Sequence, residues 1–280
     1  MNRRAFLGCC AFCLAGRAAH GEEQSFICAV EDSAVSDALK FRPADGYGQN
    51  LIFKTDLGPL VFTPYGTAFK NDIWLPEDSE TKDKITLGVA FLNGEKRQHD
   101  IVMQSARMWL GTHVGTFLDF DFTASLDKAH IRVEVFSDQN WSAIGRRAKA
   151  VTTPYTMRFS DLYPASIMHE FGHAVGLQHE HRFPLSTIEW KEDAVFRDMH
   201  AKGWDEETVR EQILTKLDKS AVCLADPTLN KSSIMMYPIQ DGWATILDEH
   251  GTRVAFAVKP TTISDGDVAC LTGLYKPLSM

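Results

Sequence analysis

The feature that most constrains this chain is one short stretch, His169-Glu170-Phe171-Gly172-His173-Ala174-Val175-Gly176-Leu177-Gln178-His179. Residues four apart on a helix project from the same face, so His169 and His173 point the same way. A continuing helix would carry His179 away from them. Gly176 permits a positive φ angle, which ends the helix and turns the chain back. The spacing therefore predicts that three imidazoles meet at one point.

Three imidazoles at one point are typical of a zinc site. Neutral histidine binds zinc at about 2.0–2.1 Å, and three protein ligands leave a fourth position open for water, as in catalytic sites. Glu170 follows the first ligand and is placed to face that position. It would act as general base towards the water and then as proton donor to the leaving amine. The pattern predicts peptide-bond hydrolysis with one catalytic zinc ion, Zn2+.

The same residues resemble the motif of the metzincin metallopeptidases, H-E-x-x-H-x-x-G-x-x-H followed by a methionine turn. The candidate turn is residues 233–238, in which Met235 would form a hydrophobic floor beneath the histidines. Glu180 and Tyr237 match positions of the astacin-like branch of that family. The resemblance implies that Tyr237 coordinates zinc and swings away to stabilise the oxyanion, and that Glu180 is structural.

The resemblance also implies a fold and a place for the substrate. We expect an α+β metzincin-like peptidase, with a twisted mixed sheet and the active-site helix in an N-terminal half. A mostly helical and irregular C-terminal half would begin at His179. Residues 140–146 look like the loop before the substrate-facing edge strand, which is expected at residues 155–159. Met236 and the segment 183–185 depart from the astacin pattern, so the chain reads as a bacterial-type relative.

Hydrophobic periodicity gives a coarse secondary structure that agrees with an α+β class. Strands alternate or run apolar over a few residues, whereas helices carry apolar residues three or four apart. Glycine and proline break residues 22–83 into short pieces, among which a hairpin is expected. The expected strands are 51–53, 60–62, 85–92, 131–136 and 155–159, and the expected helices are 101–110, 164–176, 191–202, 206–214 and 264–274.

The first 21 residues have the pattern of an export signal. A short basic start precedes an apolar stretch and small residues suited to cleavage. Arg3-Arg4 also resembles a twin-arginine signal. We therefore expect a secreted or periplasmic protein with a signal peptide at 1–21, an N-terminal extension or propeptide at 22–83, and a catalytic domain at 84–280.

Two residues of the extension are candidates for blocking the zinc in a latent form. Cys28 carries a thiol, and thiolate is a good zinc ligand. It could equally be buried or disulfide-bonded, since Cys223 and Cys270 also follow the signal and could pair with each other. Asp56 ends a stretch that faintly resembles the astacin propeptide motif F-x-G-D, although an ordinary turn aspartate has the same appearance.

The composition of the chain limits the classes of molecule that it is expected to bind. A formal net charge of −8 argues against nucleic acid or an anionic membrane. No segment after the signal approaches the roughly 20 apolar residues of a membrane span. The expected partner is a peptide or protein substrate, bound by a monomer. The alternative is a catalytically silent or highly restricted zinc-binding protein on the same fold, although such decay is expected to lose Glu170 or a ligand, and all remain.

Overall fold

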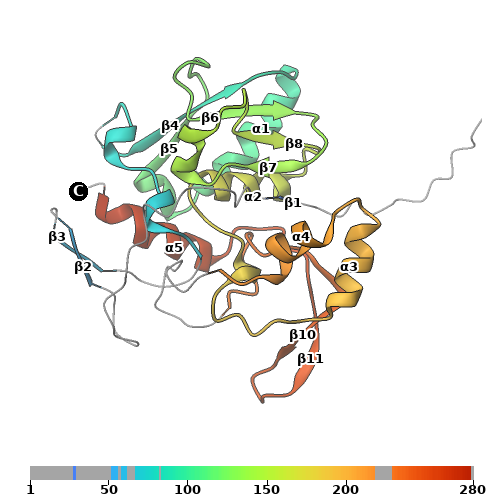
Figure 1. The fold of residues 1–280 in the computed structure, drawn as a ribbon. Coiled ribbons are helices and arrows are strands. Elements are labelled where there is room, and N and C mark those ends of the chain that lie inside the picture. Colours follow the sequence, from blue (N-terminus) through green and yellow to red (C-terminus); the bar gives the residue numbers. More distant parts are fainter. Residues whose placement is uncertain are drawn as a thin grey trace, which may run out of the picture.

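The computed structural model describes residues 28–29, 52–55, 58–61, 67–81, 83–217 and 229–278. The predicted signal peptide, Asp56 and Cys223 lie outside these residues. The molecule has two parts: a sheet with two long helices, and a smaller part built of short helices and strands (Figure 1). The chain passes from the first part to the second after the helix that carries His169 and His173.

A six-stranded sheet forms the first part. Its order is β1-β7-β8-β6-β4-β5. Strands β5, β4, β6 and β8 are parallel, whereas β7 runs antiparallel to β8 and β1 pairs with β7 in parallel. The central strand β4 is almost entirely buried, as expected of a parallel strand covered on both faces. The bounds are β1 Cys28–Ala29, β4 Ile85–Phe91, β5 Leu118–Asp121, β6 Ile131–Val135, β7 Asn140–Ser142 and β8 Met157–Phe159.

Helices α1 (Lys96–Leu110) and α2 (Pro164–Ala174) pack against each other beside this sheet. The buried face of α1 includes Trp109, whose indole Nε1 donates a hydrogen bond of 2.9 Å to the Met168 carbonyl of α2. A proline opens α2, where its missing N–H costs nothing. Short 3-10 turns connect the elements: η2 Lys70–Asp72, η3 Pro76–Asp78, η4 His113–Thr116 and η5 Gly145–Ala150.

The second part follows His179 and has its own apolar core around Trp243. It begins with the turn η6 (Glu180–Arg182). Its helices are α3 (Glu192–His200) and α4 (Glu206–Val209), and α4 continues as the π-helical turn η7 (Arg210–Leu214). Its sheet has the order β11-β10-β9, with β9 at Glu189–Trp190, β10 at Ile239–Leu247 and β11 at Arg253–Val258. Helix α5 (Asp265–Tyr275) then returns to the first part, and Cys270, Leu271 and Tyr275 are buried in the main core. A final turn, η8, covers Lys276–Leu278.

The mixed sheet, the helix α2 and the change of character after His179 confirm the predicted fold class. The predicted hairpin is also present, as β2 (Ile52–Thr55) paired antiparallel with β3 (Gly58–Val61). The expected edge strand at 155–159 is wrong, because β8 lies between β6 and β7 and cannot be an edge. β8 is followed by β7 and then by the two-residue edge strand β1, and both are too short to give an alternation signal.

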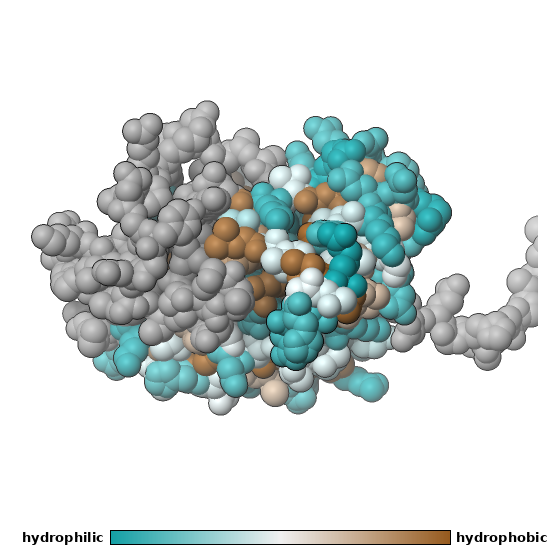
Figure 2. All heavy atoms as spheres, turned by 90° about the horizontal axis from the view of Figure 1, so that it is seen from below, coloured by the Kyte–Doolittle hydropathy of each residue, from teal (hydrophilic) through white to brown (hydrophobic). Residues whose placement is uncertain are grey.

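The surface is mixed. Seen from below the view of Figure 1, hydrophobic residues gather near the centre of the face, and hydrophilic residues lie to the right of them and below them (Figure 2). Within the described residues, no helix is long and apolar enough to cross a membrane.

The segment before β4 is tied to the end of α2. Trp74 is fully buried, and its indole Nε1 donates to the Ala174 carbonyl at 2.8 Å. Its backbone N–H donates at 3.1 Å to the hydroxyl of Tyr275, which itself donates at 2.9 Å to the Val175 carbonyl. The two carbonyls belong to the last turn of α2, where a helix has no partners of its own. The segment and α5 therefore complete this helix end.

Tyr275→Phe removes one hydroxyl that serves two buried backbone groups. We expect the free energy of unfolding to fall by about 1–3 kcal/mol, because a buried N–H and a buried carbonyl lose their partner. Urea unfolding followed by far-UV circular dichroism measures the change. Tyr163→Phe is the control, since Tyr163 is 56% exposed. Equal midpoints for the two variants would contradict the bridging role of Tyr275.

Candidate metal centre

Helix α2 ends in a turn that brings the third histidine back. Gly176 has a φ of +101°. The Gly176 N–H donates to the His173 carbonyl at 2.8 Å, and the Leu177 N–H donates to the Gly172 carbonyl at 3.0 Å. These two bonds form a Schellman motif, which uses a left-handed residue to satisfy the last helix carbonyls. The predicted role of Gly176 in turning the chain is confirmed.

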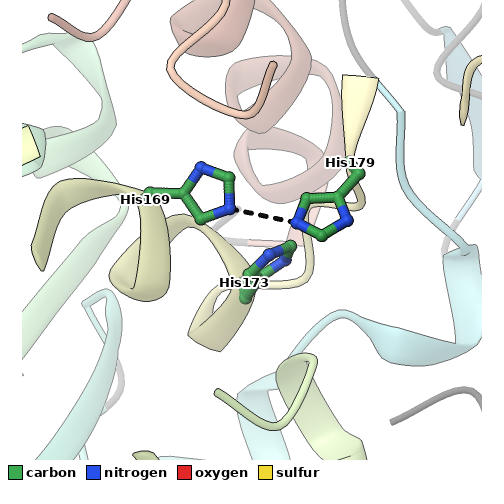
Figure 3. Close-up of side chains that lie close together, drawn as sticks. All are labelled: His169, His173 and His179. Atoms are coloured by element: carbon green, nitrogen blue, oxygen red, sulfur yellow. Dashed lines mark hydrogen bonds between the residues drawn. The ribbon is translucent and has the colours of Figure 1, made fainter. Parts of the chain in front are cut away.

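The turn places His169, His173 and His179 around one point (Figure 3). One ring nitrogen from each residue lies within 4.8 Å of the others, and all three side chains are buried. The Nε2 atoms of His169 and His179 are 3.2 Å apart. Two of the three rings come from a single face of α2, and the third comes from the residue just before η6.

Two of the rings are oriented by backbone carbonyls. His169 Nδ1 lies 2.8 Å from the Ile234 carbonyl oxygen, and His173 Nδ1 lies 2.8 Å from the Leu177 carbonyl oxygen. A carbonyl accepts only, so each Nδ1 carries the proton and each Nε2 keeps its lone pair. Metal-binding histidines are commonly held in this way. Both Nε2 atoms are thereby prepared as donors to a metal.

Burial keeps the three rings neutral. It lowers the pKa of His173 to about 4, and it lowers the pKa of His169 and His179 well below the usual value, with the neighbouring rings adding repulsion for the latter two. Neutral imidazole is the form that binds zinc. His173 Nε2 and His179 Nδ1 are buried and have no hydrogen-bond partner among the described residues. A cluster of neutral, buried nitrogen donors fits one zinc ion.

Gly172 allows the methionine turn to lie against α2. A Cβ built on Gly172 would come 2.3 Å from the Met235 sulfur and 3.2 Å from Trp109 Cζ2. The turn is held from α5 by Asp267, a buried carboxylate that accepts from the Ser233 hydroxyl and, at 2.9 Å, from the Ile234 N–H. The Ile234 carbonyl orients His169, so Asp267 is linked to the His169 ring through Ile234.

Glu180 anchors the chain on the far side of the third histidine. Its side chain is buried and accepts from the Thr67 hydroxyl and the Asn230 N–H, each at 2.9 Å. Its own N–H donates to the Met235 carbonyl at 2.9 Å. Burial raises the pKa of Glu180 to about 8. The residue joins three distant segments, which agrees with a structural role.

Tyr237 and His181 lie on one side of His179. The ring of Tyr237 is 5.9 Å from that of His179 and 5.3 Å from that of His181, centroid to centroid. His181 is buried rather than exposed to solvent, and its Nε2 lies 3.0 Å from the Gln212 carbonyl oxygen. Glu170 is also fully buried, one residue after His169 on α2.

The comparisons with known proteins identify a fold. No protein-family model and no curated protein sequence matches the chain. A structure of myroilysin has a TM-score of 0.58 at 20% identity and covers 75% of this chain and 98% of that one. A crystal structure of myroilysin has a TM-score of 0.45 at 20% sequence identity and covers 76% of this chain and 99% of that one. High choriolytic enzyme 1, a hatching enzyme zinc-protease from Oryzias latipes (medaka fish), has a TM-score of 0.49 at 16% sequence identity. Its structure covers 74% of this chain and 96% of that one. The chain has the fold of myroilysin.

Sequence reasoning found the three histidines but missed the residues that hold them. Asp267 belongs to the N-terminal cap of α5, where its Oδ2 accepts from the Ser264 N–H at 2.9 Å. Its second role depends on contact with a segment more than thirty residues away, which no local pattern indicates. Gly172 carried no signal, because glycine inside a helix predicts only a weaker helix.

Gly172→Ala tests the packing between α2 and the methionine turn. Alanine ordinarily stabilises a helix by about 1 kcal/mol relative to glycine. Here the added methyl group would overlap Met235, and we expect a net loss of about 1–3 kcal/mol in the free energy of unfolding.

The measurement is urea unfolding in the presence of a chelator, so that metal binding does not enter. Met235→Ala supplies the matched test, because it removes the overlapping side chain. In that background Gly172→Ala should cost much less. A stabilising effect of Gly172→Ala in the unsubstituted chain would show that the turn does not press on the helix.

Proposed function

We propose that the chain is a zinc-dependent endopeptidase of the astacin-like metzincin kind, with His169, His173 and His179 as the metal ligands. The observation that carries the proposal is the cluster of three neutral, buried imidazoles with preset tautomers. The sequence motif and the fold shared with myroilysin support it.

The proposed chemistry assigns a separate task to each side chain. Zinc held by the three histidines would supply a Lewis acid that polarises a substrate carbonyl and acidifies a water. Glu170 would take the proton from that water as general base and deliver it to the leaving amine. Its position on α2 next to His169, fully buried, supports this role. Tyr237 would donate a hydrogen bond to the oxyanion, as the family resemblance implies.

The proposal extends to export and maturation. The basic and apolar pattern of residues 1–21 supports a signal peptide, and hence a secreted or periplasmic enzyme. Residues 22–83 remain our candidate for an extension or propeptide, with Cys28 and Asp56 as candidate zinc blockers. Trp74 packs in the main core, which supports keeping the last part of this segment with the catalytic domain.

Glu170→Ala separates catalysis from metal binding. We expect hydrolysis of a mixed quenched-fluorescent peptide library to fall by about 10²- to 10⁴-fold, because the general base is lost. Zinc content, measured on the same preparation, should stay at one ion per chain. Chelation of the unsubstituted protein should abolish cleavage, and added zinc should restore it.

A zinc-loaded protein that cleaves no library peptide would favour the alternative of a silent or highly restricted protein. In that case the part of the segment 22–83 that precedes Thr67 should first be removed by limited proteolysis and the assay repeated. Cleavage that survives both chelation and Glu170→Ala would contradict the proposed mechanism.

Tyr237→Phe tests the proposed oxyanion donor. Loss of one such donor typically lowers kcat by about 10²- to 10³-fold, while KM changes little. Steady-state kinetics on one cleaved peptide measures both constants. Tyr155→Phe is the control, since Tyr155 lies beside β8 and contacts Trp141. A fall in kcat no larger than that of the control would remove Tyr237 from the mechanism.

A further inference from the structure

The residue before the third histidine is held from outside the zinc helix. Gln178 donates its backbone N–H to the Thr67 carbonyl at 2.7 Å, and the neighbouring Leu177 forms a β-bridge with Ala68. The side-chain Nε2 of Gln178 donates to Asp72 Oδ2 at 3.2 Å. Both the backbone and the side chain of Gln178 are therefore fixed by the segment 67–72.

Asp72 is in turn held by a charged partner. Arg147 in η5 donates from Nε to Asp72 Oδ1 at 2.9 Å and from Nη2 to Asp72 Oδ2 at 2.8 Å. This two-point pairing fixes the orientation of the carboxylate as well as its place. The Asp72 side chain is 7% exposed and that of Arg147 is 23% exposed, so water screens the pair only weakly. Arg147 therefore holds the Asp72 carboxylate in the orientation in which Asp72 Oδ2 accepts from Gln178.

The segment 67–72, the turn η5 and the turn at Gly176 also pack closely against one another through their backbones. A Cβ built on Gly145 would lie 1.7 Å from the Asp72 carbonyl oxygen and 3.2 Å from Gly176 Cα. A Cβ on Gly176 would lie 3.5 Å from the same Asp72 oxygen. Because interiors at this density transmit displacements, a shift of Asp72 or of η5 is felt at the turn before His179.

We propose that Asp72 and Arg147 are positioning residues for the metal centre. They form a clamp that fixes Gln178, and through it His179, relative to the two ligands on α2. The clamp also couples η5, which follows strand β7, to the third ligand. This inference rests on the proposed zinc-binding role of His179.

A second ion pair shows what the clamp adds. Arg146 and Asp78 join the same two stretches of chain, with Arg146 Nε 2.8 Å from Asp78 Oδ2. The side-chain contacts of Asp78 are with Leu75, Arg146 and Lys149, none of which belongs to the metal turn. Simple attachment of the segment to η5 is therefore already provided, whereas the contact with Gln178 belongs to Asp72.

The test measures the zinc dissociation constant of the full chain by competition with a chromophoric chelator. Asp72→Asn and Arg147→Gln should weaken zinc binding about 10- to 100-fold, as is usual when groups that orient metal ligands are removed. The absorption spectrum of the cobalt-substituted protein should change in the same variants. Arg147→Lys keeps the charge but loses the planar fork, and should give an intermediate loss.

Arg146→Gln is the matched control, and its zinc affinity and cobalt spectrum should equal those of the unsubstituted chain. An equal loss in Arg146→Gln would show that the effect is general attachment and would overturn the clamp. Unchanged zinc affinity in both Arg147 variants would overturn it too, and these partly exposed substitutions decide the question if Asp72→Asn fails to fold.

His179→Ala distinguishes failure of this inference from failure of the proposed function. Tight zinc binding that needs His179 but is indifferent to Arg147 removes the clamp and leaves the metal site. Zinc binding that is indifferent to His179 overturns both the metal site and the clamp.

Discussion

The mutual approach of three buried imidazoles is the constraint on which the rest of the structure depends. Rings whose nitrogens lie within 4.8 Å of one another cannot all be protonated, and burial lowers the pKa of each further. The interior must therefore hold neutral rings with their lone pairs facing a common point. Backbone carbonyls at Ile234 and Leu177 impose this by taking the Nδ1 protons of the two rings on α2. Buried neutral rings whose lone pairs converge in this way form a site suited to binding a cation.

The methionine turn joins the two halves of the molecule at this point. Ile234 and Met235 belong to the core beneath the sheet, whereas Met236 and Tyr237 belong to the core of the second part. One short turn thus packs in two directions, and the carbonyl that orients His169 lies within it. Asp267 fixes the turn from α5, a helix that itself packs in the first core. The orientation of the His169 ring consequently depends on how the two parts are assembled.

The sequence predicted the features that local rules determine. The helix spacing of His169 and His173 and the turn at Gly176 follow from backbone geometry within one segment. Strand β7, which lies in the expected loop 140–146, and the sheet of β9, β10 and β11 were not predicted, because these strands are short or, like β10, interrupted by a bulge. The supports of the site, such as Asp267 and Asp72, act through partners distant in the chain. Their side chains look like ordinary cap and turn aspartates until the fold brings the partners together.

The contrast between the first two ligands and the third follows from the same reasoning. A helix alone sets the relation of His169 to His173, since both lie on one face of α2. His179 lies outside any long element and is fixed on either side instead. Gln178 is held by the segment 67–72, and Glu180 by Thr67 and Asn230. A correctly formed helix therefore sets the spacing of His169 and His173, whereas the orientation of the His169 ring and the place of His179 need the assembled molecule. The three-histidine site can form completely only when folding is complete.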